Sequence, residues 1–231
     1  MIKTIIFDLG KVLVDFDMNK IWKGFVRDTD VPVSKMEGIV YETTDEDVLK
    51  YGTSKKKGMA FKLDTGKINS REFYGWMRQK LNLRDINFRE FDKVWGDIFT
   101  VNKPVCDLVK KLYDNGYGLV ALSDTDPIQR RYITSTIPNT MKLFNGKIVT
   151  SHDKDVCSMK PAKKNYLAAM ARGNAKLKDK IKPEEYAYVD DRSKYVSPAI
   201  KLGMNGIWYD FDKDKKAEKL IKDLKKLGVR C

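Results

Sequence analysis

Short apolar segments alternate with amphipathic helical patterns from residue 103 to the end of the chain. The apolar segments YGLVALSD, GKIVTS, EYAYVDD and MNGIWYD are each followed by a stretch whose apolar residues recur at helical spacing. Residues 2–7 predict one more buried strand, because they are short, apolar and rich in β-branched side chains. The alternation predicts an α/β fold: a Rossmann-like parallel sheet core with helices on both faces.

Residues 18–98 have a different pattern, in which aromatic residues recur at helical spacing. The stretch NSREFYGWMRQKLNL places Phe73 and Met77 on one helix face and offers Asn69 or Ser70 as the N-cap. The stretch NFREFDKVWGDIF repeats the pattern. We therefore predict a helical insert with no strong strand inside.

The insert divides the predicted core into two pieces, residues 1–17 and 99–231. We expect Asp15 and Asp17 to be turn and hinge residues that cap the first helix of the insert, with substrate contact as the alternative. Residues 54–68 are expected to contain a loop or short turn.

The composition is that of a folded protein with a well solvated surface. Of the 231 residues, 42% are apolar and 33% are charged, and the aromatic residues are too many for a disordered chain. No apolar run approaches the ~18 to 20 residues that a membrane span needs. Asp8 interrupts the first apolar run where a signal peptide would continue. We expect a cytoplasmic protein without a membrane partner.

The formal net charge of +13 could attract nucleic acid or a phosphorylated ligand. The lysines are mixed with acids, however, as in KDKKAEKLIKDLKKLG, which is typical of a solvated helix face. We expect no nucleic-acid partner, and the oligomeric state stays open. Three distant cysteines without a CxxC spacing and the single His152 indicate neither a zinc site nor a disulfide framework.

Polar residues follow three of the predicted strands where each strand ends. Asp8 ends the first strand, Ser123 and Asp124 end YGLVALSD, and Asp190 and Asp191 end EYAYVDD. In an open parallel sheet the ligand site lies at the carboxyl ends of the strands, so these side chains converge if their strands are neighbours. Several carboxylates at close range need a cation to stay ionised, and an all-oxygen cluster suits Mg²⁺.

A carboxylate in such a cluster can also attack phosphorus and form an aspartyl phosphate. Lys160, in the MKP stretch before a predicted helix, could neutralise a phosphoryl oxygen. Ser123 could donate a hydrogen bond to another phosphoryl oxygen.

Four segments occur in an order that resembles the motifs of the haloacid dehalogenase-like (HAD) hydrolase superfamily: IIFDLGKVL, ALSD, SMKPAKKNYLAAM and AYVDDRSKYVSPAIKLGM. The resemblance covers nearly the whole chain. It is greatest for the branch with a small helical cap inserted after the first motif. That branch includes sugar-phosphate phosphatases such as bacterial glucose-1-phosphatase, and the phosphatase domain of soluble epoxide hydrolases. The resemblance implies that residues 18–98 form the cap domain.

The resemblance also implies a Mg²⁺-dependent phosphatase that acts on a small phosphorylated metabolite such as a sugar phosphate. Asp8 would be the nucleophile, and Ser123 and Lys160 would hold the phosphoryl group. Asp8, Asp191 and the carbonyl of Gly10 would bind Mg²⁺, with Asp190 either a ligand or a group behind the ligands.

Gly10 stands where most phosphatases of the family have a second Asp, which protonates the leaving group. General acid–base help of this kind is typically worth 10²–10⁴-fold. The glucose-1-phosphatase-like branch also has Gly there. The chain is therefore expected to be slow, to be restricted to good leaving groups, or to use another acid.

Two further departures concern the substrate. Asp124 stands where an Asn often follows the Ser, and Tyr195 where an Asp or Asn is common. Asp124 and Lys11 are candidate substrate-binding residues, and Arg130 or Arg131 could pair with Asp124.

Two alternatives to the phosphatase stay open. One is a catalytically weak or repurposed binding or regulatory protein on the same fold. The other is a 2-haloacid dehalogenase, which also lacks the second Asp but uses no metal; the acidic VDD segment argues against it.

Overall fold

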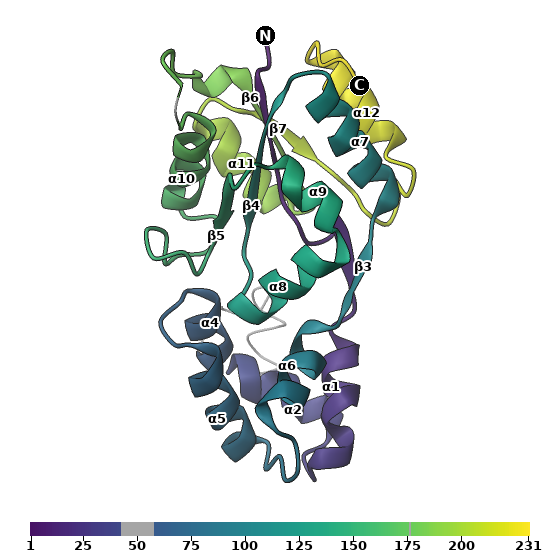
Figure 1. Ribbon diagram of the computed structural model, residues 1–231, viewed down its shortest axis with the longest axis vertical. Coiled ribbons are helices and arrows are strands. Elements are labelled where there is room, and N and C mark those ends of the chain that lie inside the picture. Colours follow the sequence, from purple (N-terminus) through teal and green to yellow (C-terminus); the bar gives the residue numbers. More distant parts are fainter. Residues whose placement is uncertain (43–57, 176) are drawn as a thin grey trace.

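The structure is a computed structural model that describes residues 1–42, 58–175 and 177–231. Its centre is a five-stranded sheet in the order β5-β4-β1-β6-β7, in which every neighbouring pair is parallel (Figure 1). The predicted α/β class is thus confirmed. The strands are β1 (Thr4–Phe7), β4 (Gly118–Ser123), β5 (Ile148–Thr150), β6 (Tyr186–Asp190) and β7 (Asn205–Trp208).

Strand β1 lies in the middle of the sheet, and all four of its side chains are buried there. It pairs with β4 and β6 in register, so that Thr4 lies beside both Gly118 and Tyr186. A Cβ on Gly118 would overlap the Thr4 side chain, so the close approach of the two strands requires glycine there. The three strands run the same way and end at the same edge of the sheet.

Helices cover both faces of this sheet, as Figure 1 shows. One apolar cluster joins one face to α7, α8, α9 and α12, and a second joins the other face to α10 and α11. These helices are α7 (Lys103–Asp114), α8 (Pro127–Thr136), α9 (Pro138–Leu143), α10 (Lys163–Gly173), α11 (Ser193–Lys201) and α12 (Glu218–Lys226), and a short 3₁₀ turn, η2 (Pro183–Glu185), precedes β6.

The described part of residues 18–98 contains helices and no strand, and it lies at the carboxyl edge of the sheet (Figure 1). Its own apolar cluster is rich in aromatic rings; Phe73, for example, lies edge-to-face with Trp95 at a centroid distance of 4.8 Å. We call this part the helical lobe. Its helices are α1 (Asn19–Phe25), η1 (Val26–Asp28), α2 (Val33–Tyr41), α4 (Gly58–Asp64), α5 (Ser70–Lys80) and α6 (Phe88–Gly96).

Two helices of the lobe begin with the same reciprocal cap. Asn69 accepts hydrogen bonds from the backbone of Arg71 and Glu72, while the Glu72 side chain accepts from the Asn69 N–H. Asn87 caps α6 in the same way. Asn69, rather than Ser70, is therefore the N-cap of α5. Part of the expected 54–68 loop is helix α4, a turn follows at Thr65 and Gly66, and residues 54–57 lie outside the described residues.

The chain enters and leaves the lobe through two short strands, β2 (Val14–Phe16) and β3 (Phe99–Val101), which pair antiparallel. The sequence did not predict them. Asp15 lies within β2 and its carboxylate pairs with Lys11, so the expectation that Asp15 caps the first helix was wrong. Asp17 accepts a hydrogen bond of 3.0 Å from the N–H of Asn19, at the start of α1.

Helix α6 of the lobe packs directly on α8 of the core. The indole of Trp95 donates a hydrogen bond of 2.8 Å to Asp126, which is the N-cap of α8. Arg131 of α8 forms an ion pair with Asp92 of α6. A Cβ on Gly96 would overlap the ring of Tyr132, so the two helices touch at a glycine.

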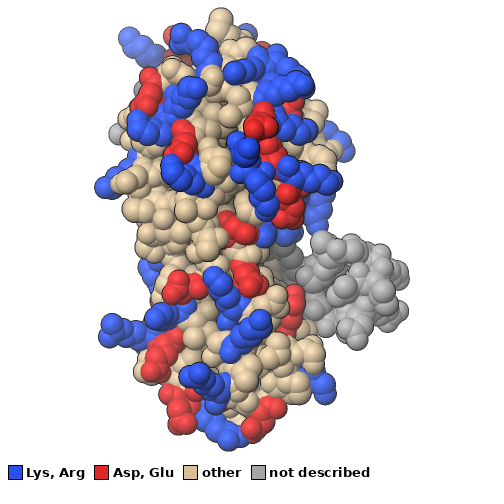
Figure 2. All heavy atoms as spheres, turned by 90° about the vertical axis from the view of Figure 1, so that its right-hand side faces the viewer, with Lys and Arg blue, Asp and Glu red and all other residues tan. Residues whose placement is uncertain are grey.

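Figure 2 shows basic and acidic side chains intermingled over the surface that it faces. Helix α7 carries the ion pairs Lys103–Asp107 and Lys110–Asp114, each one turn apart. Opposite charges at this spacing are typical of a solvated helix face. Among the described residues, no helix is both long and apolar enough to cross a membrane.

Candidate active site

Three strand ends of the central sheet bring their carboxylates together. Asp8 directly follows β1, Asp190 is the last residue of β6, and Asp191 comes next in the chain. One carboxylate oxygen from each lies within 4.8 Å of the others. Ser123, buried at the end of β4, joins them because β4 is the other neighbour of β1. Strand order therefore explains how residues more than a hundred positions apart meet.

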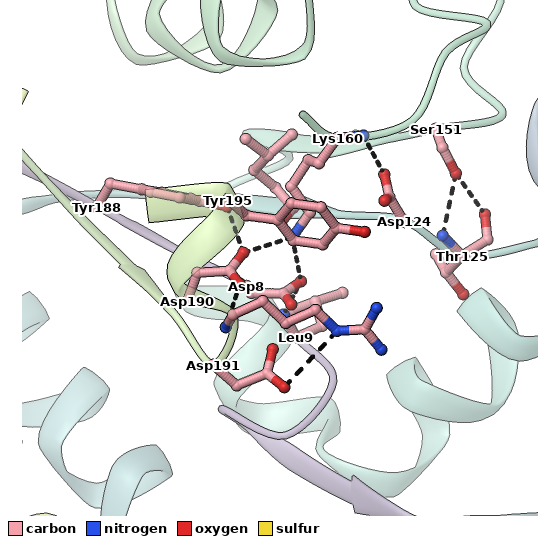
Figure 3. Close-up of polar contacts among 12 residues, drawn as sticks. Asp8, Leu9, Asp124, Thr125, Ser151, Lys160, Tyr188, Asp190, Asp191 and Tyr195 are labelled. Atoms are coloured by element: carbon pink, nitrogen blue, oxygen red, sulfur yellow. Dashed lines mark hydrogen bonds and ion pairs between the residues drawn. The ribbon is translucent and has the colours of Figure 1, made fainter. Parts of the chain in front are cut away.

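Lys160 lies among these acids with its side chain only 1% exposed (Figure 3). Its Nζ is 2.7 Å from Asp190 Oδ2 and 3.1 Å from Asp8 Oδ1. Burial alone would lower the pKa of Lys160, but the carboxylates of Asp190 and Asp8 outweigh it and hold the pKa well above its usual value. The lysine is thus a fixed positive charge in the site.

Asp190 is fully buried, and both of its oxygens already have protein partners. Oδ2 accepts hydrogen bonds from Lys160 Nζ and the Tyr188 hydroxyl, and Oδ1 accepts one of 2.8 Å from the N–H of Arg192. These contacts suit a group that holds Lys160 in place. The sequence left open whether Asp190 is a metal ligand or a group that supports the ligands from behind. The structure favours the supporting role.

Asp8 and Asp191 are the carboxylates best placed to hold a cation. Burial raises the pKa of Asp8 to about 7; Lys160 opposes the shift, while Asp190 and Asp191 add to it. Burial, followed by the nearby Asp190, raises the pKa of Asp191 to about 6. Below about pH 6 both groups would keep protons to a large extent unless a cation replaced them. An oxygen-only pair beside a glycine backbone fits a hard divalent ion.

The two carboxylate oxygens of Asp8 differ in their contacts. The N–H of Leu9 donates a hydrogen bond of 2.8 Å to Oδ1, and Lys160 also lies nearest to Oδ1. Both contacts orient the carboxylate without using Oδ2. The geometry therefore leaves Oδ2 as the oxygen that can form a new bond.

A cavity of about 260 Å³ opens beside this cluster, between the sheet and the helical lobe. The predicted residues Asp8, Gly10, Ser123, Asp124, Lys160 and Asp191 all line it. The lobe contributes residues that sequence reasoning did not single out as part of a site, among them Glu37, Tyr41, Phe61, Asp64 and Trp95. Nothing in their local sequence separates them from ordinary helix residues, so only the fold reveals them.

Lys11, a predicted substrate-binding residue, is not among the residues that line the cavity. Its ammonium pairs with Asp15 and lies 5.1 Å from the ring centre of Phe16 and 5.2 Å from that of Phe211. In this structure Lys11 therefore contacts side chains next to the loop that follows β1. Its contact with a substrate stays a prediction.

Phe16 stands close to the position where a second carboxylate would begin. A Cβ built on Gly10 would lie 3.1 Å from the edge of the Phe16 ring. The Phe16 ring therefore occupies space next to Gly10 into which a larger side chain at position 10 would extend.

The two other departures from the family pattern also have definite surroundings. Asp124 accepts a hydrogen bond of 2.9 Å from the N–H of Lys160, which ties the second motif to the third. The proposed arginine partners have contacts elsewhere: Arg131 pairs with Asp92, and Arg130 contacts Thr134. The ring centre of Tyr195 lies 5.1 Å from Lys160 Nζ, so the tyrosine covers the buried lysine.

The sequence profile of the haloacid dehalogenase-like hydrolases matches residues 2–203. The fold is similar to that of a HAD family enzyme from Bacteroides thetaiotaomicron solved with magnesium and inorganic phosphate, at 19% identity and a TM-score of 0.66, over 90% of this chain and 94% of that one. A predicted HAD-like family hydrolase from Porphyromonas gingivalis is 20% identical with a TM-score of 0.71, over 100% of both chains. The L-2-haloacid dehalogenase of Xanthobacter autotrophicus is 16% identical with a TM-score of 0.53, over 89% of this chain and 76% of that one.

Proposed function

Because the chain belongs to the haloacid dehalogenase-like hydrolase family, we propose that it is a Mg²⁺-dependent phosphatase of small phosphorylated metabolites, which acts through an aspartyl phosphate on Asp8. The observation that carries this proposal is the buried Lys160 among three carboxylates that lie within 4.8 Å of one another. Such a site has a nucleophile, a fixed positive charge for a phosphoryl group and acids for a divalent ion in one place.

The residues of the chain have separate tasks in this reaction. Oδ2 of Asp8 forms a bond to phosphorus as the ester P–O bond breaks, and the leaving oxygen takes its proton from solvent water. Lys160 and the Ser123 hydroxyl hold two phosphoryl oxygens during the transfer. Water then cleaves the aspartyl phosphate, which releases inorganic phosphate and restores the carboxylate. Mg²⁺, held by Asp8, Asp191 and the Gly10 carbonyl, would neutralise negative charge between nucleophile and phosphoryl group.

The comparison with the Bacteroides enzyme supports the choice of ligand, since that enzyme was solved with magnesium and inorganic phosphate. A 2-haloacid dehalogenase is the second candidate, because Gly10 and the similarity to the Xanthobacter enzyme are compatible with it. The paired acids Asp190 and Asp191 weigh against it. Without a cation, they would repel the carboxylate of a haloacid.

Two assays on the same protein test the proposal. Release of phosphate from p-nitrophenyl phosphate should require Mg²⁺, stop with EDTA and be lost in Asp8→Asn. Asp191→Asn should need much more Mg²⁺ for half-maximal rate, whereas Asp107→Asn, an exposed acid outside the site, should need no more than wild type.

Hydrolysis that persists in excess chelator would contradict the proposed metal dependence. Chloride release from 2-chloropropionate without phosphate release would assign the dehalogenase instead. If neither substrate reacts while Mg²⁺ and inorganic phosphate still bind, the chain is the repurposed binding protein.

A further inference from the structure

Four apolar residues line the cavity where the chain enters and leaves the helical lobe. They lie in β2 and β3 or directly beside these strands, and we call them the ribbon wall: Phe16, Met18, Ile98 and Phe99. Phe16 and Phe99 are partners across the two strands, and their rings meet edge-to-face with 6.2 Å between the centroids. Gly10 lines the same cavity, and its Cβ position is 3.1 Å from the Phe16 ring. The ribbon wall therefore begins beside the loop that follows β1.

The side chains of the ribbon wall have surface left for a ligand. Phe16, Met18 and Phe99 are only half-buried, although all three line the cavity. Apolar surface of this kind is stabilised when an apolar group of a ligand removes it from water. The two phenyl rings also favour contact with another ring, in an offset or edge-to-face arrangement. The ribbon wall is thus suited to an apolar and aromatic part of a ligand.

The position of Asp8 determines which part of a phosphate ester meets this wall. In an in-line displacement the leaving oxygen departs on the side of phosphorus opposite the attacking oxygen. Asp8 lies at the carboxyl end of β1, and β3 lies between the core and the helical lobe (Figure 1). The group attached to the leaving oxygen therefore points away from the sheet, toward the ribbon wall and the lobe.

The chemistry of the ribbon wall restricts the leaving group. None of its four side chains can donate a proton, and Gly10 has no side chain. A leaving oxygen beside this wall therefore departs as an anion or waits for a proton from water. The hydroxyl of a phenol has a pKa of about 10, as in tyrosine, whereas the pKa of water is about 15.7 and simple alcohols are similar. A phenolate is consequently a far better leaving group here than an alkoxide.

The cavity has room for one aromatic ring together with a phosphoryl group. Its volume is about 260 Å³, and Ser123 and Lys160 line it. An apolar cavity of about 150 Å³ is large enough to hold benzene. The volume therefore suits a single ring at the ribbon wall with the phosphoryl group beside the lysine.

We propose that the substrate is a small aryl phosphate, a phosphate monoester of a phenolic hydroxyl, whose ring contacts Phe16 and Phe99. This inference rests on the proposed phosphatase function and names its substrate class. The ribbon wall provides affinity for the ring, and the ring provides a leaving oxygen that needs no acid at position 10. Binding and reactivity thus select the same esters.

Phosphonates separate binding from reactivity, because their P–C bond is not hydrolysed. Benzylphosphonate has a methylene group in place of the leaving oxygen of phenyl phosphate, cyclohexylmethylphosphonate has a saturated ring of similar size, and ethylphosphonate has no ring. Each is tested as a competitive inhibitor of the Mg²⁺-dependent hydrolysis of p-nitrophenyl phosphate. Benzylphosphonate should bind about ten- to fiftyfold more tightly than ethylphosphonate. It should bind about two- to tenfold more tightly than the cyclohexyl compound.

Variants of the two rings identify the residues responsible. Phe16→Leu and Phe99→Leu keep an apolar side chain but remove the ring, so each should weaken inhibition by benzylphosphonate about two- to tenfold and leave ethylphosphonate within about twofold. Phe88→Leu is the matched control, because Phe88 is a half-buried ring of the lobe that contacts Tyr74 and does not line the cavity. It should leave both inhibition constants at their wild-type values. An equal loss for both phosphonates in the ring variants would contradict a specific contact with the ring.

The outcomes separate the inference from the function on which it rests. If p-nitrophenyl phosphate is hydrolysed with Mg²⁺ but the three phosphonates inhibit equally well, the preference for a ring is wrong and the phosphatase stands. A higher kcat/KM for glucose 1-phosphate than for phenyl phosphate would also overturn the preference, because the ribbon wall offers no partner for sugar hydroxyls. If no ester is hydrolysed, the phosphatase is wrong. Calorimetric binding of benzylphosphonate and ethylphosphonate to the Mg²⁺-loaded protein then decides the preference, and equal affinities overturn it.

Discussion

Removing the divalent ion should make the stability of the protein strongly dependent on pH, because Asp8 holds its proton too tightly for a carboxyl group. Its pKa rises from 3.8 to about 7 through burial, against the opposing effect of Lys160. Between these two values the folded protein binds more protons than the unfolded chain. The metal-free protein is therefore most stable at low pH within this window and loses stability as pH rises toward 7.

The magnitude follows from the size of that difference. One pKa unit is worth about 1.4 kcal/mol, so ionising Asp8 in the folded metal-free protein costs on the order of 4 kcal/mol at pH 7.5. At pH 5 the cost is only about 2 kcal/mol, because Asp8 then stays protonated in the folded state. Asp191, whose side chain is 20% exposed and whose pKa is about 6, adds a smaller contribution of the same sign.

Thermal unfolding in EDTA and in Mg²⁺, at pH 5 and at pH 7.5, measures this effect. The gain in Tm from Mg²⁺ should be larger at pH 7.5, and the difference of about 2 kcal/mol from Asp8 alone corresponds to roughly 4–8 °C. In EDTA at pH 7.5, Asp8→Asn should melt above wild type, whereas Asp107→Asn should keep the wild-type pH dependence. If metal-free Asp8→Asn is no more stable than wild type at pH 7.5, Asp8 is not a strained carboxylate and the reasoning fails.

Three further substitutions test other parts of the structure. In Gly10→Asp, the introduced acid can protonate the leaving oxygen, so log kcat/KM should depend less steeply on leaving-group pKa than in wild type. A wild-type slope that is already shallow would mean that another group supplies the proton. Gly96→Ala should lower the free energy of unfolding by about 1–3 kcal/mol because its methyl group meets the Tyr132 ring, while Gly75→Ala, with no atom within 4 Å of the new methyl, should cost nothing in the same urea titration. Asn87→Ala should cost about 1 kcal/mol by the same measurement through loss of the α6 cap, and an unchanged midpoint would deny that cap its role.

The features that the sequence predicted well have a strong period or a fixed chemical position. Each strand of the central sheet could be predicted because a buried parallel strand is a short apolar run between turn signals. The start of α5 could be predicted to within one residue, at Asn69 or Ser70, because both are good N-cap residues and Glu72 lies in the first turn; the structure selects Asn69. Convergence of Asp8 with Asp190 required only that their strands be neighbours, which β1 and β6 are.

The features that the sequence did not predict depend on contacts between distant segments. Strands β2 and β3 have three residues each, too few for an alternation to be visible. Helix α9 has six residues and begins at Pro138 directly after α8, so it carries no period of its own. Asp124 finds its partner in a backbone N–H that lies 36 positions away, and no local pattern encodes that contact.

The β2–β3 ribbon carries both chain connections between the helical lobe and the core, while α6 and α8 form the noncovalent contact between them. Phe16 and Phe99 face each other across the ribbon, so a short turn between them could close the chain where the lobe now departs. All five strands of the central sheet and its cluster of acids lie outside the excised stretch. Loops of different length close at nearly equal entropic cost, which permits such exchanges. A foreign lobe joined to this ribbon would place other side chains beside the same cluster of acids, provided that it covers the apolar face of α8 around Ile128.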